Sequence, residues 1–288
     1  MDLTLTNLWR VTSKLALTPT AVSRGSTRGG PRTRDPAVLE WSIGLETDAR
    51  RALQLRPTLE GSQGKEGVGW RIQAGVEVVA RPAGRIEIAA APTWDRRSVG
   101  DQYVGSTNTV PYPETYGRRY LYADLERRDL SMQTRLNWAF TPRSSLQIYM
   151  QPLFSSAEVR RYKQLEAPET FRFVGFREGR YDGSGGRAAC AGGTTCLAPD
   201  GQRHLDFTGD GTSDHTIRDR NFNVRSVRAT AVYRWEYRPG SAFLIIWQRR
   251  QEGEGPGHPT SMFRHLRALG QLPSDNTLIV KANIWLPF

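Results

Sequence analysis

Residues Leu130 to Phe140 read LSMQTRLNWAF and alternate with a period of two. The even positions hold leucine, methionine, threonine, leucine, tryptophan and phenylalanine, whereas the odd positions hold serine, glutamine, arginine, asparagine and alanine. Successive side chains of a β-strand point to opposite faces of the sheet. The stretch therefore predicts a strand with one apolar face and one wet face.

The same alternation recurs along the whole chain. It is found in Glu40–Glu46, Leu53–Arg56, Arg71–Val78, Arg85–Ala90, Leu146–Phe154 and Asn276–Phe288. In the last of these, Leu278, Val280 and Ile284 fall on one face, and Lys281 and Asn283 fall on the other. This pattern predicts an all-β protein.

The connections between these segments alternate between short and long. In chain order they are Leu17–Pro36, Asp48–Arg51, Gly61–Gly67, Arg81–Gly84, Ser106–Gly117, Thr141–Ser144, Glu158–Asp219, Arg238–Ser241 and Glu252–Ser274. Bacterial outer-membrane barrels have short periplasmic turns and long external loops. We therefore predict an antiparallel transmembrane β-barrel of about ten strands occupying residues 1–288, with a long extracellular loop at 158–219. The barrel is either complete or the C-terminal part of a larger one.

The predicted barrel depends on how two of its strands are assigned. The alternation of short and long connections holds only if Arg118–Phe140 is a single strand, in which we expect a slip of parity near Arg127–Asp129. The first strand is expected at Leu3–Val11. If the ten strands are not the full set, this strand and Leu278–Phe288 would be unpaired edges, which lipid does not tolerate.

Average composition does not oppose a barrel. The hydrophobic share is 38%, the mean hydropathy is −0.55, and the longest dense apolar run is Phe243–Trp247. A membrane helix needs about 18 or more apolar residues, but a spanning strand needs only about ten, of which alternate residues face lipid. The short apolar runs therefore argue against helical spans, whereas mean hydropathy does not decide for or against strand spans.

The chain is basic, with a formal net charge of +11 and a pI near 10.1. Its arginines are spread among 29 acidic residues, and no nucleic-acid motif is present, so we expect no nucleic-acid partner. In a barrel, lumenal arginines would pair with lumenal glutamates on neighbouring strands, and surplus loop arginines would meet anionic lipopolysaccharide. The predicted lumenal set is Arg71, Glu77, Arg85, Glu87, Arg135, Arg234 and Glu236. An ordinary solvated charged face accounts for most of them equally well.

Aromatic residues stand immediately before two tight turns. Trp138 and Phe140 precede one, and Trp235 and Tyr237 precede the other. An aromatic girdle at the inner membrane interface would place them there. Ordinary core aromatics are the alternative.

Cys190 and Cys196 enclose a Gly-rich segment inside the longest loop. Their proximity predicts a small disulfide formed in an oxidising compartment. A zinc-type site is disfavoured because the nearest histidines, His204 and His215, lack ligand spacing.

A calcium loop is a hypothesis for residues 206–214, which read DFTGDGTSD. Oxygen-bearing side chains at alternate positions around a glycine turn suit this hard cation, and the ligands would be Asp206, Thr208, Asp210 and Asp214. Thr208 stands where the helix-loop-helix form has Asp or Asn, and Ile217 replaces its bidentate glutamate. A plain polar turn is the alternative.

Catalysis has little support in the sequence. His204, His215, His258 and His265 all fall in long loops, and no nucleophile elbow, His-Glu-Xaa-Xaa-His motif or phosphate-binding loop is present. A hydrolase would need a histidine held beside a nucleophile by a rigid strand end. We therefore predict that the chain is not an enzyme.

Four collinear stretches resemble the domain of unknown function 5916 family: Ser26–Arg50, Asp101–Thr109, Glu114–Ser156 and Phe222–Arg250. The most specific is the RWEYRPGS turn within the last. The resemblance implies a bacterial outer-membrane barrel that commonly follows an N-terminal module similar to the family 9 carbohydrate-binding domain. A terminal aromatic such as Phe288 also resembles the recognition signal of the barrel-assembly machinery.

Three functions fit these observations. The first is a pore or uptake barrel whose polar lumen passes a carbohydrate or another small solute. The second is a membrane anchor for a periplasmic carbohydrate-binding-like module, and the third is a soluble all-β binding protein. Met1–Leu5 carries no export signal, so we expect the chain to be the C-terminal portion of a longer precursor.

Overall fold

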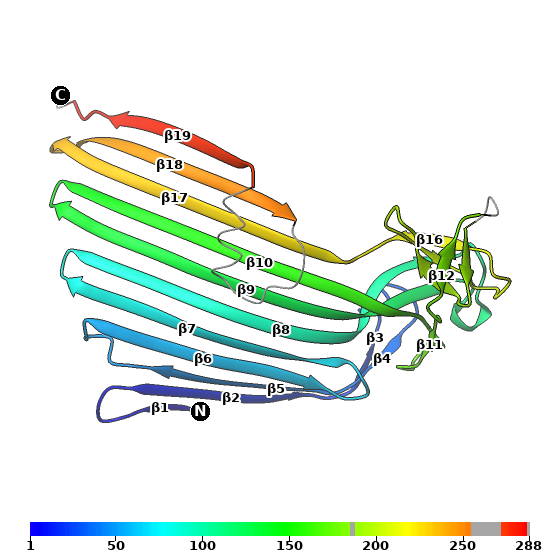
Figure 1. The fold of residues 1–288 in the computed structure, drawn as a ribbon. Coiled ribbons are helices and arrows are strands. Elements are labelled where there is room, and N and C mark those ends of the chain that lie inside the picture. The colour runs from blue at the N-terminus through cyan, green and yellow to red at the C-terminus, as the bar shows by residue number, and fades with distance from the viewer. Residues whose placement is uncertain (185–187, 255–271, 287–288) are drawn as a thin grey trace.

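In the computed structural model, residues 1–184, 188–254 and 272–286 are described, and one large antiparallel sheet dominates them (Figure 1). The strands of its main path, in their spatial order, are β1 (Asp2–Thr4), β2 (Arg10–Thr18), β5 (Val38–Glu46), β6 (Leu53–Gly64), β7 (Gly69–Ala83), β8 (Ile86–Thr107), β9 (Arg119–Thr141), β10 (Ser144–Leu165), β17 (Phe222–Arg238), β18 (Ser241–Glu254) and β19 (Ser274–Asn283). Each main-path strand pairs antiparallel with its neighbour.

The predicted all-β fold is confirmed, and ten strands of nine or more residues lie in the main path within the described ranges. The expected first strand at Leu3–Val11 is wrong. Residues 2–4 and 10–18 instead form two antiparallel strands, because the chain turns back between them, with Leu8 at a φ of 63°. In the described residues the outermost strands β1 and β19 pair with their inner neighbours and not with each other, so the sheet has two edges.

The two ends of the sheet differ as the sequence predicts. One end carries the tight connections β7–β8, β9–β10 and β17–β18 (Figure 1). In the last of these, Gly240 takes a φ of 78°, which favours glycine over residues with a Cβ. The other end carries the long connections β2–β5, β8–β9 and β10–β17. The β6–β7 connection at that end departs from the predicted alternation, because it spans only residues 65–68, whereas β5–β6 at the tight-turn end spans 47–52. Strand β10 runs to Leu165, so the longest connection starts later than the predicted Glu158.

Small elements gather beyond the long-connection end. The segment between β10 and β17, called the cap below (residues 166–221), contains β11 (Phe173–Gly175), which pairs with β10, and β12 (Arg180–Asp182), β13 (Ala189–Ala191), β14 (Thr195–Leu197), β15 (Gln202–Leu205) and β16 (His215–Arg218). A hairpin of β3 (Ala21–Ser23) and β4 (Thr33–Asp35) lies at the same end (Figure 1). The 3-10 helix η1 (Pro113–Thr115) lies in the connection between β8 and β9. The described part of the chain has no helix with the length and apolar character to cross a bilayer.

The largest fully buried cluster of apolar side chains lies where the cap meets β8, β9 and β10. Leu121 and Ala123 of β9 pack there with Val104, Val159 and Leu205, the last of which comes from β15. On the opposite face of β9, Tyr120 and Tyr122 pack with Leu165. The end of β9 nearest the cap is therefore buried on both faces.

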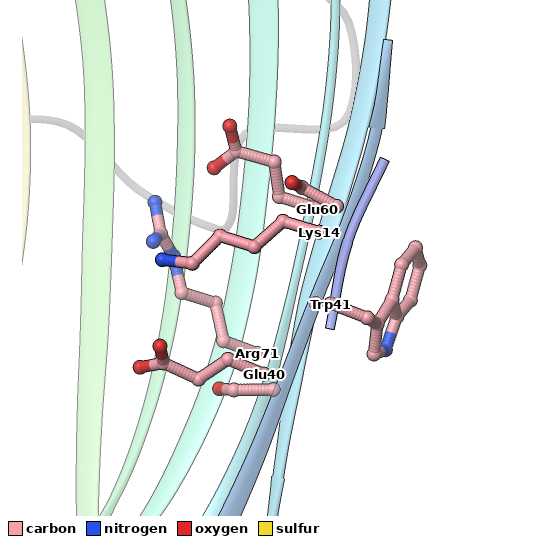
Figure 2. A pocket seen from close by; sticks show the side chains of 8 residues that line it. Lys14, Glu40, Trp41, Glu60 and Arg71 are labelled. Atoms are coloured by element: carbon pink, nitrogen blue, oxygen red, sulfur yellow. The ribbon is translucent and has the colours of Figure 1, made fainter. Parts of the chain in front are cut away.

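Nearer the tight turns the two faces differ in polarity. The ladders place Arg135 of β9 beside Ala89 and Tyr149, and Leu136 beside Ile88 and Ile148. We call the face of Arg135 the inner face and that of Leu136 the outer face. Figure 2 shows the same division at the first strands, where Lys14, Glu60 and Arg71 project to one side and Trp41 to the other.

Candidate functional site

The polar inner face is the candidate functional site. Its side chains are fixed by strand register, because a shift of one residue would exchange the two faces. On β9 the inner positions Gln133, Arg135 and Asn137 are exposed. The pairings continue this face across the sheet through Gln151 and Arg228 on one side and through Glu77 and Arg56 on the other.

The inner face of β5–β8 holds alternating ion pairs. The Arg56 guanidinium lies 3.0 Å from a carboxylate oxygen of Glu46 and 2.7 Å from one of Glu77. Arg81 contacts Glu87 at 2.8 Å. Each of these side chains is more than a third exposed, so each pair contributes little to stability, about 0–1 kcal/mol. Their effect is to balance charge on this wall.

A denser cluster surrounds two aspartates near the middle of the sheet. Asp95 of β8 and Asp129 of β9 are direct cross-strand partners. Asp95 accepts from Arg71, and Asp129 accepts a 3.0 Å hydrogen bond from Arg127 and another from Ser155. Arg97 lies within 3.8 Å of Asp95 and 3.6 Å of Asp129. The arginines therefore compensate two carboxylates that would otherwise repel each other.

A small hollow opens on the inner face of the first strands. It has a volume of about 280 Å³, and Lys14, Glu40, Glu60 and Arg71 line it (Figure 2). Lys14 of β2 is the cross-strand neighbour of Ser42, and Ser42 is that of Glu60. One lysine thus stands among carboxylates on this wall.

The inner face of β9, β10 and β17 is different, because neutral polar groups dominate it. The Arg135 guanidinium lies over the Tyr149 ring at 5.6 Å from its centroid, and the Tyr149 hydroxyl donates to Gln151 at 3.2 Å. Gln133, Asn137 and Gln147 complete the set. This wall offers many amide groups and few carboxylates.

A larger hollow of about 690 Å³ lies at the tight-turn end of the inner face, and we call it the mouth. Arg50, Arg51, Arg81 and Arg85 line it, together with Glu87, Asn137 and Gln147. Beside it, the side-chain hydrogen bond from Arg50 lowers the pKa of Asp48 to about 2. Arginine is the main charged residue of this hollow.

The predicted lumenal residues are all on or beside the inner face, but most pair differently from the expected scheme. Arg234 contacts Glu236 at 2.9 Å, but the two residues lie on the same strand, β17, and not on neighbouring strands as predicted. Arg71 contacts Asp95, Glu77 contacts Arg56, and Glu87 contacts Arg81. Arg85 donates to the carbonyl oxygen of Phe140 at 3.4 Å, and Arg135 packs on Tyr149.

Sequence reasoning missed the Asp95–Asp129 cluster. The signal was present, because Asp95, Arg97, Arg127 and Asp129 share one parity with Arg135. The expected slip of parity near Arg127–Asp129 obscured it. That slip is wrong, since both ladders of β9 run without a register shift through these residues.

The cysteine prediction is confirmed. Cys190 and Cys196 form a disulfide with their Cα atoms 5.4 Å apart, within the usual range for such bridges. The bond joins β13 to β14 inside the cap. Both sulfur-bearing residues are buried.

The residues of the calcium hypothesis serve the backbone of their own loop. Asp206 accepts from the amides of Gly209 and Gly211 at 2.6 and 2.8 Å, and Asp214 accepts from that of Thr208 at 3.0 Å. Asp210 accepts from the amide of Thr212 at 2.7 Å. No group of three or more His, Cys, Asp or Glu placed to hold a metal ion occurs within residues 1–184, 188–254 and 272–286. The calcium site stays a prediction, and a polar turn accounts for the observed bonds.

The histidines of the cap are placed by packing. His204 stacks on Tyr181 with ring centroids 5.4 Å apart, and its Nδ1 lies 3.1 Å from the Ser213 hydroxyl. His215 stacks on Phe207, and burial lowers the pKa of its imidazole. His258, His265 and Phe288 lie outside the described residues.

Comparisons with known proteins identify no family. No family model matches the chain, and no curated protein matches it. Among solved structures, a copper transporter, OprC, is similar with a TM-score of 0.43 at 10% sequence identity. The match covers 95% of this chain and 37% of that one, so the chain spans little more than a third of the transporter's length. The resemblance to the domain of unknown function 5916 family stays a prediction.

Proposed function

We propose that the sheet forms the wall of a β-barrel in the bacterial outer membrane and that its inner face passes polar solutes. The observation that carries the proposal is the difference between the two faces. Over the ten long strands, register gathers ion pairs and amides on the inner face and apolar side chains on the outer face. A water-filled lumen and a lipid surface require this division.

The outer face supports a lipid contact because its apolar side chains are left uncovered. Leu15 of β2 is 73% exposed, Ile43 of β5 is 50% exposed, and Leu278 of β19 is 66% exposed. Further exposed members are Leu17, Leu53, Leu55, Leu59, Ile88, Phe243, Ile245 and Val280. Soluble proteins rarely expose apolar patches of more than a few hundred square ångströms. A bilayer would cover this belt.

Aromatic residues at the tight-turn end support the same orientation. The rings of Trp138 and Phe140 are 4.3 Å apart, and Trp235, Tyr237 and Phe243 form a second group with centroids 5.0–6.3 Å apart. Amphipathic rings favour the level of the lipid headgroups. This end would then lie at the periplasmic interface, and the cap would lie outside the cell.

Other parts of the proposal rest on the sequence. Arginines of the outer loops would meet lipopolysaccharide, and Phe288 would engage the barrel-assembly machinery. A family-5916-type barrel could instead anchor a periplasmic carbohydrate-binding-like module without passing solutes. A soluble all-β binding protein is the third reading, and the exposed outer belt opposes it.

Reconstitution tests the proposal. We expect purified chain to need detergent, to migrate differently on gels before and after boiling, and to give single-channel currents in planar bilayers. Stable currents support passage of solutes. A detergent-dependent protein that gives no current with any electrolyte would favour the anchor, and a protein soluble without detergent would overturn the membrane assignment.

A further inference from the structure

The inner wall of β9, β10, β17 and β18 contains a row of cations and amides. Register aligns Gln133, Gln151, Arg228 and Arg250 across these four strands, and Arg228 and Arg250 are direct cross-strand partners. Arg250 contacts Glu252 at 2.9 Å. Within the described residues, no carboxylate lies within 4.0 Å of Arg228 or of Arg135, which stands one inner position further along β9.

Like charges directly opposite each other on one face repel, as Arg228 and Arg250 do, although Arg250 also has Asp275 of β19 as a cross-strand partner. Arg135 and Arg228 are exposed on the inner face, so an anion can reach both guanidinium groups. The guanidinium group only donates hydrogen bonds, and the glutamine and asparagine amides add further donors. The groups of this wall together present a surface suited to a negatively charged solute.

The wall leads to the mouth. Asn137 of β9 and Gln147 of β10 line the mouth. Each lies one inner position closer to the tight turn than Arg135 and Tyr149 respectively, or about 6.6–6.8 Å along the strand. The single carboxylate among the mouth's lining residues, Glu87, is held by Arg81 at 2.8 Å. Arginine, asparagine and glutamine side chains therefore line the inner face from the mouth to Arg228, and a small anion can pass from one to the next.

The opposite wall lacks this property. Lys14 shares its hollow with Glu40 and Glu60 (Figure 2), and the arginines of β6 and β7 contact carboxylates. Above the mouth, arginines without a carboxylate of the described residues within 4.0 Å therefore stand on the β9 and β17 side, whereas the cations of β6 and β7 are paired. This contrast supplies a matched control, because Lys14 is a cation on the balanced wall.

We propose that the solute guided by this inner face is a small anion of the phosphate or carboxylate class, bound along Arg135 and Arg228 and admitted through the arginines of the mouth. This inference rests on the proposed function, which it deepens by naming the chemical class of solute. Binding and passage are separate properties, so they are measured separately.

Binding is tested with inorganic phosphate and the full chain in detergent, by thermal unfolding at constant ionic strength. We expect phosphate to raise the melting temperature of the unsubstituted chain, and the Arg135→Gln, Arg228→Gln double variant to weaken the apparent affinity about tenfold, as loss of one to two charge-assisted hydrogen bonds would. Lys14→Gln should leave the affinity unchanged. The Arg135→Lys, Arg228→Lys variant, which keeps both charges, should recover part of it.

Passage is tested by reversal potentials under a KCl gradient in planar bilayers. A shift toward the chloride equilibrium potential, reduced in the glutamine double variant and kept in Lys14→Gln, supports the inference. Equal phosphate affinity in all variants overturns the inference, whatever currents are seen. Variant-dependent phosphate binding without any current overturns solute passage and leaves the anion site standing.

Discussion

The two ends of β9 lie in different surroundings. Near the tight turns its inner face is polar and its outer face is apolar, whereas near the cap Leu121 and Tyr122, on opposite faces, are each only 1% exposed. The strand itself does not change parity between these ends. The extra residues of the nearby bulges belong to β8 and β10, between Val99 and Gln102 and between Arg160 and Lys163.

This comparison shows what an alternating pattern reports. Period-two alternation appears only where the two faces of a strand meet different surroundings. Near the cap, Leu205 and its neighbours cover one face of β9, and Leu165 and Phe173 cover the other. Apolar residues at both parities there indicate a strand buried on both sides.

The largest effect is expected from Leu121→Ala. This side chain is 1% exposed in the cluster that joins the cap to β9, so the cavity should cost about 2–5 kcal/mol. The measurement is denaturant unfolding in detergent, with protease digestion reporting on the cap. Leu136→Ala, on the outer face of the same strand, is the control and should cost less because lipid or detergent fills the space. Equal losses would show that the two ends are not distinct.

A charge on the outer face should cost slightly less. We expect Met132→Arg, on the outer face and six residues from Trp138, to destabilise the protein in lipid vesicles by about 2–4 kcal/mol, the range for a cation near the bilayer midplane. Gln133→Arg, on the exposed inner face of the same strand, should change the unfolding free energy by less than about 0.5 kcal/mol. If both variants unfold alike, the outer face does not contact lipid.

The disulfide should stabilise the cap alone. Cys190→Ser opens a loop with a sequence separation of 6, which on the chain-entropy model costs about 2 kcal/mol. Protease cleavage near Arg203 should accelerate, whereas the gel mobility change on boiling should persist. Reductant added to the unsubstituted chain should reproduce the effect. A loss of sheet stability equal to that of the cap would contradict a separable cap.

The smallest effect concerns pH. Burial lowers the pKa of His215 below its ordinary value of 6.5, so the unfolded chain binds the proton more readily than the folded cap. Cap stability should therefore be complete above 6.5 and fall as pH drops below it. His215→Phe, which keeps a ring beside Phe207, should remove that part of the pH dependence of proteolysis. An unchanged pH profile would show that His215 does not titrate in this way.

Much of the fold follows from the sequence because register and connection length are local properties. The stretch 130–140 fixes two faces, and Pro239-Gly240 fixes a tight turn. The structure of the cap does not follow, since β12–β16 are three or four residues long and depend on contacts such as Leu205 with β9. Short strands without alternation give no periodic signal.

The sequence predicts which charged residues share the inner face but not which of them form ion pairs. Parity identifies Arg71, Arg135 and Glu77 as residues of one face. The partner of each depends on stagger between strands, which places Asp95 rather than Glu77 beside Arg71. Stagger is set by turns and bulges along the full ladder, and a single strand's sequence does not contain it.

Labelling of single cysteines along β9 tests the central claim most directly. The two native cysteines are joined in a disulfide and do not react with maleimides, so each new cysteine at positions 132–137 reports alone. In lipid vesicles, a water-soluble maleimide should label the variants Gln133→Cys, Arg135→Cys and Asn137→Cys, and a lipid-soluble one should label Met132→Cys, Thr134→Cys and Leu136→Cys. Labelling of both sets by the water-soluble reagent at the same rate would contradict a strand with one face in lipid and one in water.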